Sequence, residues 1–134
     1  TKKYDFIVDG SDSLSTRYLL NALCYKLKKP FLTGAISQWD GQIGLYDPNH
    51  GSPCFECVFP KTDSDIQTTS CADGGVFGPL AGVVGSLMAA EIIKFIVKAG
   101  KLLVDDLILY DSLSGEMRRY KTKKRKDCPV CCVN

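Results

Sequence analysis

Two Cys-x-x-Cys pairs constrain this chain more than any other feature of its sequence. The first pair is Cys54 and Cys57, the second is Cys128 and Cys131, and 71 positions separate Cys57 from Cys128. Two residues between cysteines let both thiolates point at one ion, and four thiolates form a closed tetrahedral zinc site. A closed site leaves no position for a substrate. The predicted zinc is therefore structural and ties the end of the chain to its middle.

Other interpretations of the cysteines stay open. The pairs could be unrelated free or redox-active thiols, and Cys132 could replace Cys131 as the fourth ligand. A thioredoxin-like dithiol site is disfavoured because its reactive pair stands at the start of a helix, whereas Cys54 lies in a segment rich in Pro and Gly and Cys128 lies near the end of the chain. Cys24 falls on the apolar face of a predicted helix, and we expect it in the core.

Composition limits the classes of protein to consider. The chain has 134 residues, of which 45% are hydrophobic, so one domain over residues 1–134 is expected. The net charge of only +2 gives no electrostatic case for binding nucleic acid or an anionic membrane. Seven cysteines is an odd number, and the first residues do not resemble a secretory signal. We therefore expect a cytoplasmic domain without a nucleic-acid or membrane partner.

Residues 4–36 have the pattern of a strand–helix–strand unit. Residues 4–8 predict a buried strand, and the polar residues 11–15 supply N-cap oxygens for a helix that ends at Pro30. Residues 31–36 predict the second strand. Strands joined in this way are parallel, with a right-handed crossover, and ligands gather at their carboxyl ends. Three residues are expected near that edge: Asp9, Asp12 and Gly34.

The rest of the chain contains further strands and one apolar helix. Residues 41–46 predict a third strand, and residues 107–111 and 116–120 predict a hairpin. Residues 61–70 are almost wholly polar and predict a surface loop. The helix expected over residues 79–98 is apolar around most of its circumference, so we expect it to be buried between a sheet and a second subunit.

Two further residues are candidates for chemistry. Asp12 could hold Mg²⁺ against a polyphosphate, or it could merely cap the helix. Cys71 could be a nucleophile that attacks an activated acyl group, or an ordinary loop cysteine. Asp9 and His50 are interpreted as a structural residue and a solvated loop residue. The basic residues of segment 121–126 could be solvated or could meet an acidic partner protein.

Taken together, the motifs resemble those of the MoeB/ThiF/HesA family, ubiquitin-activating-enzyme-like adenylyltransferases that act on small sulfur-carrier proteins. The resemblance covers nearly all 134 positions. It is carried by Asp9-Gly-Ser-Asp12 with Arg17 and Asn21, Gly34 followed by Gly41-Gln42, Cys54-Phe-Glu-Cys57, the segment 69–86 that contains Cys71, and Cys128-Pro-Val-Cys131. The resemblance implies an α/β fold with a mixed, mostly parallel sheet and helices. It also implies a homodimer with ATP and Mg²⁺ in each subunit.

The resemblance also implies roles for individual residues. Asp12 becomes the acidic residue of the ATP–Mg²⁺ site, with Ser13 beside it where the family usually has Asn. Cys71 matches a crossover-loop cysteine that forms a covalent link during sulfur transfer in some members, so its role here stays open. The implied zinc ligands are Cys54, Cys57, Cys128 and Cys131.

The family's glycine-rich nucleotide loop and its basic triphosphate-binding residues would lie upstream of Thr1. Backbone amides at such a loop bind phosphate, and adenylyl transfer depends on them. We therefore expect the chain to be the C-terminal half of a Rossmann-like ThiF/MoeB fold, which alone neither binds ATP tightly nor adenylates a substrate.

Three hypotheses of function follow. The preferred one is part of an ATP-dependent nucleotidyltransferase that activates the C-terminal Gly-Gly carboxylate of a ubiquitin-like sulfur carrier for thiamin, molybdopterin or tRNA thiolation. The alternative is a non-catalytic, zinc-stapled module that binds a small ubiquitin-like protein. A dithiol oxidoreductase is the third.

Overall fold

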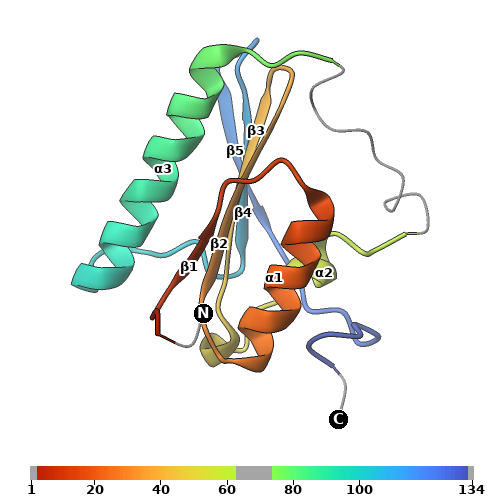
Figure 1. Ribbon diagram of the computed structural model, residues 1–134. Helices are drawn as coiled ribbons and strands as arrows, with labels where there is room; N and C mark the ends of the chain where they lie inside the picture. Colours follow the sequence, from red (N-terminus) through yellow and green to blue (C-terminus); the bar gives the residue numbers. More distant parts are fainter. Residues whose placement is uncertain (1–2, 63–73, 133–134) are drawn as a thin grey trace.

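The computed structural model describes residues 3–62 and 74–132 of the chain. Their core is a five-stranded sheet whose spatial order follows the sequence. Its strands are β1 (Ile7–Asp9), β2 (Phe31–Ser37), β3 (Asp40–Tyr46), β4 (Asp106–Asp111) and β5 (Glu116–Lys121). The two long helices, α1 (Leu14–Lys26) and α3 (Gly78–Val97), lie on opposite faces of this sheet (Figure 1). Two short helices, the 3₁₀ helix η1 (Pro48–His50) and α2 (Phe55–Val58), follow β3.

The predicted mixed α/β sheet is confirmed, but its parallel part is smaller than expected. Only β1 and β2, joined through α1, are parallel among the described strands. The β2–β3, β3–β4 and β4–β5 pairs are antiparallel. The expectation of a mostly parallel sheet is wrong for these residues because short turns join β2 to β3 and β4 to β5, and a short turn reverses the chain.

Helix α1 begins where the sequence predicts. Ser13 is its N-cap, with a side-chain oxygen that accepts a hydrogen bond from the Thr16 amide at 3.2 Å. The helix stops at Lys26, because Lys28 adopts a positive φ of 52° that a helix does not contain. The five strands and the two long helices thus match the predicted ones, with their ends shifted by a few residues, whereas η1 and α2 were not predicted.

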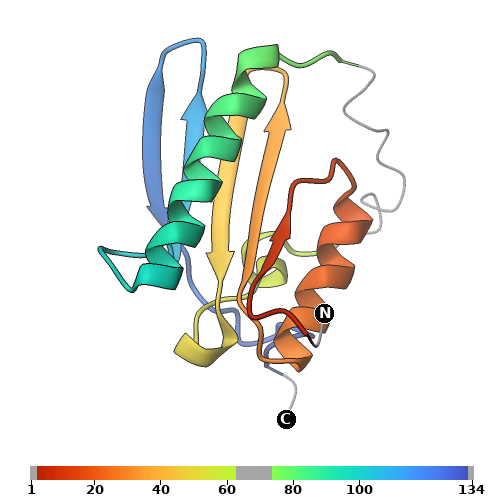
Figure 2. The same cartoon turned by 60° about the vertical axis from the view of Figure 1, so that its left-hand side comes forward.

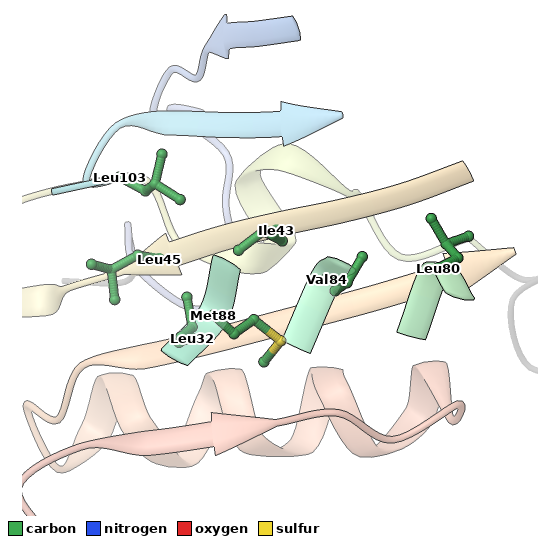
Figure 3. Close-up of a cluster of buried hydrophobic side chains, with 7 residues drawn as sticks. All are labelled: Leu32, Ile43, Leu45, Leu80, Val84, Met88 and Leu103. Atoms are coloured by element: carbon green, nitrogen blue, oxygen red, sulfur yellow. The ribbon is translucent and has the colours of Figure 1, made fainter. Parts of the chain in front are cut away.

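Helix α3 packs closely on one face of the sheet through two glycines. A Cβ atom added at Gly34 would overlap the Met88 sulfur, and one added at Gly41 would lie 2.6 Å from Val84 Cγ2. With no side chain at these points, α3 sits directly on β2 and β3 and closes the larger hydrophobic core (Figure 3). The buried members of this core are Leu32, Ile43, Leu45, Leu80, Val84, Met88 and Leu103.

The other faces of α3 are exposed in the described part of the chain. Ile93, Ile96 and Val97 are 59%, 67% and 60% exposed in the single chain. The predicted packing on the sheet is confirmed for one stripe of α3, and the predicted burial of its other side against a second subunit stays a prediction. Figure 2 shows α3 in front of the sheet, with its outer side uncovered. By length and composition alone α3 would be able to span a membrane, with a mean hydropathy of 1.9. A helix whose buried stripe packs on a sheet also has that composition, so the test is weak evidence for a span.

Candidate functional site

Four cysteine sulfurs gather beside the amino-terminal end of α2. The Sγ atoms of Cys54, Cys57, Cys128 and Cys131 all lie within 4.8 Å of one another, and all four residues are buried. Three of the sulfur–sulfur distances are 3.5 Å (Cys54 to Cys128), 3.2 Å (Cys57 to Cys131) and 3.9 Å (Cys54 to Cys57). A tetrahedron with metal–sulfur bonds of about 2.3 Å has edges of about 3.8 Å. The cluster therefore fits a metal ion.

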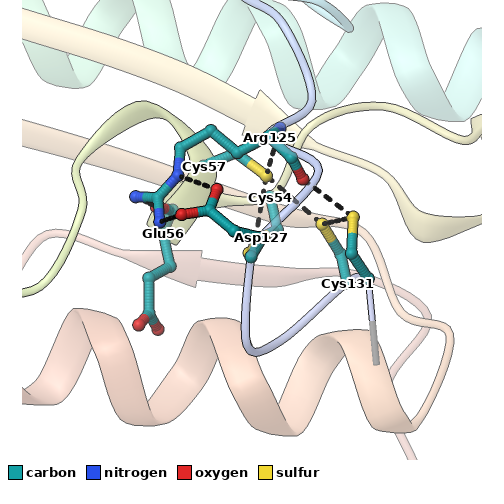
Figure 4. A network of polar contacts seen from close by, with 8 residues as sticks. Cys54, Glu56, Cys57, Arg125, Asp127 and Cys131 are labelled. Atoms are coloured by element: carbon teal, nitrogen blue, oxygen red, sulfur yellow. Dashed lines mark hydrogen bonds and ion pairs between the residues drawn. The ribbon is translucent and has the colours of Figure 1, made fainter. Parts of the chain in front are cut away.

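Arg125 connects the segment that contains Cys128 and Cys131 to the segment that contains Cys54 and Cys57 (Figure 4). Its backbone N–H donates to Cys57 Sγ at 3.4 Å, and its Nη1 donates to the Glu56 carbonyl at 3.5 Å. The same guanidinium forms a paired contact with Asp127, Nε to Oδ1 at 3.1 Å and Nη2 to Oδ2 at 3.2 Å. The hydrogen bonds from Arg125 hold the pKa of Asp127 below its usual value. Arg125 therefore supports the cysteine cluster. One expectation for the basic segment 121–126 was that its residues are solvated, and for Arg125 this is wrong.

Burial changes the proton affinity of two thiols in the cluster. Burial raises the pKa of Cys54 to about 12, and burial with a hydrogen bond to Cys57 raises the pKa of Cys131. Without an ion, burial therefore favours the neutral thiol at both groups. A metal that binds here displaces their protons, which couples metal binding to proton release.

The remaining cysteines are clearly distinguished by position. Cys132 Sγ lies 3.8 Å from Cys131 Sγ and donates to the Arg125 carbonyl at 2.8 Å, and it is not among the four mutually close sulfurs. The geometry therefore favours Cys131 as the fourth ligand. Cys24 is 1% exposed, as expected for a core residue, and burial raises its pKa to about 11.

One expectation about Cys54 is wrong. The sequence placed it in a Pro/Gly-rich loop away from any helix start, but Cys54 is the N-cap of α2. The sequence pattern for this helix is weak because α2 has only four residues. A dithiol site is disfavoured instead by the second pair, which lies directly against the first.

A second polar group occupies the carboxyl end of β1. Asp9 is buried and accepts hydrogen bonds from Thr33 Oγ1 at 3.0 Å and from the Ser11 amide at 3.1 Å. Arg17 Nε lies 3.4 Å from Asp9 Oδ2. Because all the Asp9 contacts are internal, they fit the structural role predicted for it, and they fix the loop that leads into α1.

Asp12 lies on that loop and faces solvent. It borders a cleft of about 430 Å³ between the β1–α1 loop, β2 and α3, whose lining includes Ser11, Arg17 and Gly85. The N-cap of α1 is Ser13, so Asp12 is not needed to cap the helix. An exposed carboxylate at the carboxyl end of a parallel strand has the position from which such sheets bind ligands.

Sequence comparison with the ThiF family decides the identity of the fold. The sequence model of the ThiF family matches residues 1–130 of this chain. The chain belongs to the ThiF family. It is 46% identical to the sulfur carrier protein adenylyltransferase of Thermus thermophilus over 97% of this chain and 49% of that protein. It is 43% identical to the adenylyltransferase and sulfurtransferase MOCS3 of Dictyostelium discoideum over 97% of this chain and 31% of that protein.

Solved structures match the fold of this ThiF-family chain. Escherichia coli MccB with MccA-N7isoASN aligns with a TM-score of 0.75 over 96% of this chain and 41% of that one, at 22% identity. A heterocyclase in complex with substrate and cofactor aligns with a TM-score of 0.77 over 96% of this chain and 21% of that one, at 15% identity. The chain spans about half the length of the Thermus relative and about a third of the Dictyostelium one.

Among the candidate residues that the structure describes, His50 of this ThiF-family chain joins neither cluster. His50 is an exposed residue of η1 whose Nδ1 lies 2.6 Å from Asp47 Oδ2, which agrees with its interpretation as a loop residue. Cys71 and most of the polar segment 61–70 lie outside the described residues.

Two residues at the site had no role assigned from the sequence. Arg17 and Asn21 belong to the motif that carries the resemblance, but the sequence indicates no partner for either of them. Arg17 contacts Asp9, and Asn21 Oδ1 accepts a hydrogen bond from the Phe55 amide at 2.9 Å. Their spacing of four along α1 puts both on one face of the helix, but it does not identify Asp9 or the Phe55 amide as their partners.

Proposed function

We propose that this chain is the carboxy-terminal part of an ATP-dependent adenylyltransferase that activates a ubiquitin-like sulfur-carrier protein in the cytoplasm. The carrier's terminal Gly-Gly carboxylate attacks the α-phosphate of ATP, which gives an acyl adenylate and releases pyrophosphate. ThiF-family membership and the printed names of the relatives support this activity. The observation that carries it is the position of Asp12, an exposed carboxylate at a strand's carboxyl end that no helix cap engages.

Asp12 and Ser13 are proposed to complete a nucleotide site that the longer protein builds mostly from upstream residues. The Asp12 carboxylate would hold Mg²⁺, whose chemistry is to neutralise polyphosphate oxygens. Ser13 Oγ already accepts the Thr16 amide and lies 2.8 Å from Ser15 Oγ, so it fixes the backbone that carries Asp12. Without the upstream glycine-rich loop this chain alone is inactive.

The metal of the cysteine cluster is proposed to be structural zinc held by Cys54, Cys57, Cys128 and Cys131. Four thiolates in tetrahedral arrangement suit zinc, and they leave no open coordination position. Its contribution is to fix the chain's final residues against α1 and α2.

Two surfaces are proposed for protein partners. The sheet face opposite α3 holds a cleft of about 410 Å³ bordered by β3, β4 and β5, with Leu109 and Tyr120 exposed in it, and this face would receive the carrier. The exposed apolar side of α3 would be covered in a homodimer, since exposed apolar patches mark protein interfaces.

Cys71 is proposed to act after adenylation, as the thiol that attacks the carrier adenylate and displaces AMP. Its place in the resemblance supports this role. A Cys71→Ser variant that still exchanges pyrophosphate but loses sulfur transfer supports it, and a variant that retains both activities contradicts it.

The test of the adenylation proposal is carrier-dependent exchange of labelled pyrophosphate into ATP by the full-length protein. Asp12→Ala is expected to lower exchange by 10²-fold or more, an estimate of about the size seen when one charge-stabilising group is removed. Asp5→Ala, which removes another exposed carboxylate, is the matched control and is expected to retain exchange. No exchange by the unmodified protein, together with nucleotide-independent carrier binding, would favour the alternative of a non-catalytic binding module.

A further inference from the structure

The side chain of Asn21 is a buried polar group to which the proposed function assigns no role. It is 2% exposed, and its Oδ1 accepts the Phe55 backbone N–H at 2.9 Å. A backbone N–H can only donate, so this contact fixes the orientation of the amide: the oxygen faces Phe55 and the NH₂ group faces away from it. Among the residues that the structure describes, Asn21 Nδ2 has no hydrogen-bond partner of ordinary geometry.

An acceptor for that NH₂ group is close at hand. Cys54 directly precedes Phe55 in the chain, and Asn21 and Cys54 line the same small pocket. The Cys54 sulfur is therefore the acceptor that this geometry offers to the Asn21 NH₂ group. A thiolate is a stronger acceptor than a thiol, so this contact gains strength when a metal removes the proton.

We propose that Asn21 Nδ2 donates a hydrogen bond to Cys54 Sγ in the metal-loaded protein, so that Asn21 is a positioning residue of the metal centre. The inference rests on the zinc centre proposed above. Four thiolates around a divalent ion leave two negative charges in a buried site, and N–H donors to sulfur spread that charge. The Arg125 amide supplies one such donor to Cys57 from the tail, and Asn21 supplies one to Cys54 from α1.

The same helix face holds the other cysteine segment. Tyr25 follows Asn21 by four residues, and its hydroxyl donates to the Cys131 carbonyl at 3.2 Å. Arg17 precedes Asn21 by four residues and holds Asp9 at the other end of the helix. One stripe of α1 therefore runs from the cleft that contains Asp12 to the metal centre.

The test compares zinc loss from variants of the full-length protein to a chromophoric chelator. Asn21→Asp keeps an oxygen for the Phe55 amide but removes the donor and adds a charge beside the thiolates. It is expected to release zinc about 10-fold faster or more, within the range of outer-shell substitutions. Thr33→Val is the control, because it removes an equally enclosed hydroxyl that contacts Asp9 instead of the metal centre. It is expected to lower the midpoint of thermal unfolding while leaving the release rate within about twofold.

A second measurement needs no variant. In the unmodified protein loaded with ¹¹³Cd, an N–H donor to a ligating sulfur produces a scalar coupling between its proton and the metal. We expect this coupling for the Asn21 side-chain amide, with the Arg125 backbone amide as internal reference. A coupling at Arg125 without one at Asn21, or unchanged zinc release from Asn21→Asp, overturns the role of Asn21 alone. Failure of the unmodified protein to retain any metal overturns the zinc centre and this inference with it.

Discussion

Arg17 Nε lies 3.4 Å from Asp9 Oδ2, and the two side chains are only 10% and 3% exposed. This buried ion pair joins α1 to the end of β1. Arg17 also donates to the Ser11 carbonyl through Nη2, so one side chain contacts both the end of β1 and the loop residue directly before Asp12. Asp9 and Arg17 are close in the sequence, and their contact fixes the direction in which α1 follows β1.

Replacing Arg17 by Met leaves the Asp9 carboxylate buried without its cation. Loss of one member of a buried pair costs about 3–5 kcal/mol, so we expect a decrease of that size in the free energy of unfolding. Denaturant titration followed by circular dichroism measures it. The double variant Arg17→Met/Asp9→Asn should recover part of the loss, because it no longer buries an unpaired charge. A single variant as stable as the parent would show that the pair carries no energy.

The close approach of α3 to the sheet gives a second prediction. Gly34→Ala places a methyl group where Met88 and Val84 pack, and overpacking of a core costs about 1–3 kcal/mol. Gly82→Ala is the control. Gly82 lies on α3, the helix that packs against Gly34 of β2, but a Cβ added at Gly82 meets nothing within 4 Å. Gly82→Ala is expected to raise stability by about 0.5–1 kcal/mol, because Ala favours helix more than Gly does. Equal effects of the two substitutions on the unfolding midpoint would contradict the packing described here.

Local patterns predicted most of the elements. Alternation and turn residues predicted the hairpin of β4 and β5, and the polar residues 11–15 predicted the region of the N-cap of α1, which the structure places at Ser13. The spacing of the cysteines likewise predicted that Cys54 and Cys128 would meet, because ligand geometry imposes a short, recognisable spacing.

Contacts between distant residues were not predictable in the same way. Asn21 and Phe55 meet only because η1 and α2 turn the chain back against α1, and neither short helix has a strong sequence signal. The outer face of α3 is exposed in the single chain, and its covering by a second subunit stays a prediction, because hydrophobicity indicates that a face is covered but not by which segment.

Asp106 supports a prediction about pH. Its side chain has no exposure and lies among three cations, with Lys121 Nζ at 2.8 Å, Arg119 Nε at 3.4 Å and Lys101 Nζ at 3.7 Å. Burial alone would raise the pKa of Asp106, but the hydrogen bond and charge of Lys121, with the charges of Arg119 and Lys101, outweigh it and hold the pKa below its usual value. The folded state therefore favours the ionised carboxylate.

Because the folded-state pKa of Asp106 is the lower one, its contribution to stability is present above the unfolded pKa of about 4 and is lost as pH falls through the folded value. We expect Asp106→Asn to be less stable than the parent at pH 7, with a difference in unfolding free energy that shrinks below about pH 4. Urea titrations at several pH values measure this. Asp5→Asn, at a fully exposed carboxylate, should show no such change. A difference that grows on acidification would reverse the sign worked out here.

Removal of the metal is expected to free the tail of the chain. The described tail contacts the rest of the molecule through its sulfurs, Arg125 and the Tyr25 hydroxyl, so we expect its position to depend on the ion proposed to join Cys128 and Cys131 to Cys54 and Cys57. Chelation, or the Cys128→Ser substitution, should therefore speed tryptic cleavage in the basic segment 121–126 and lower the unfolding midpoint, because metal-binding energy is folding energy in such sites. Cys132→Ser is the control and should keep both its zinc and its resistance to trypsin, since its sulfur stands outside the four-sulfur cluster. Chelator added to Cys128→Ser should cause no further change. If Cys132→Ser loses zinc as readily as Cys128→Ser does, the fourth ligand is Cys132 and the assignment of Cys131 is wrong.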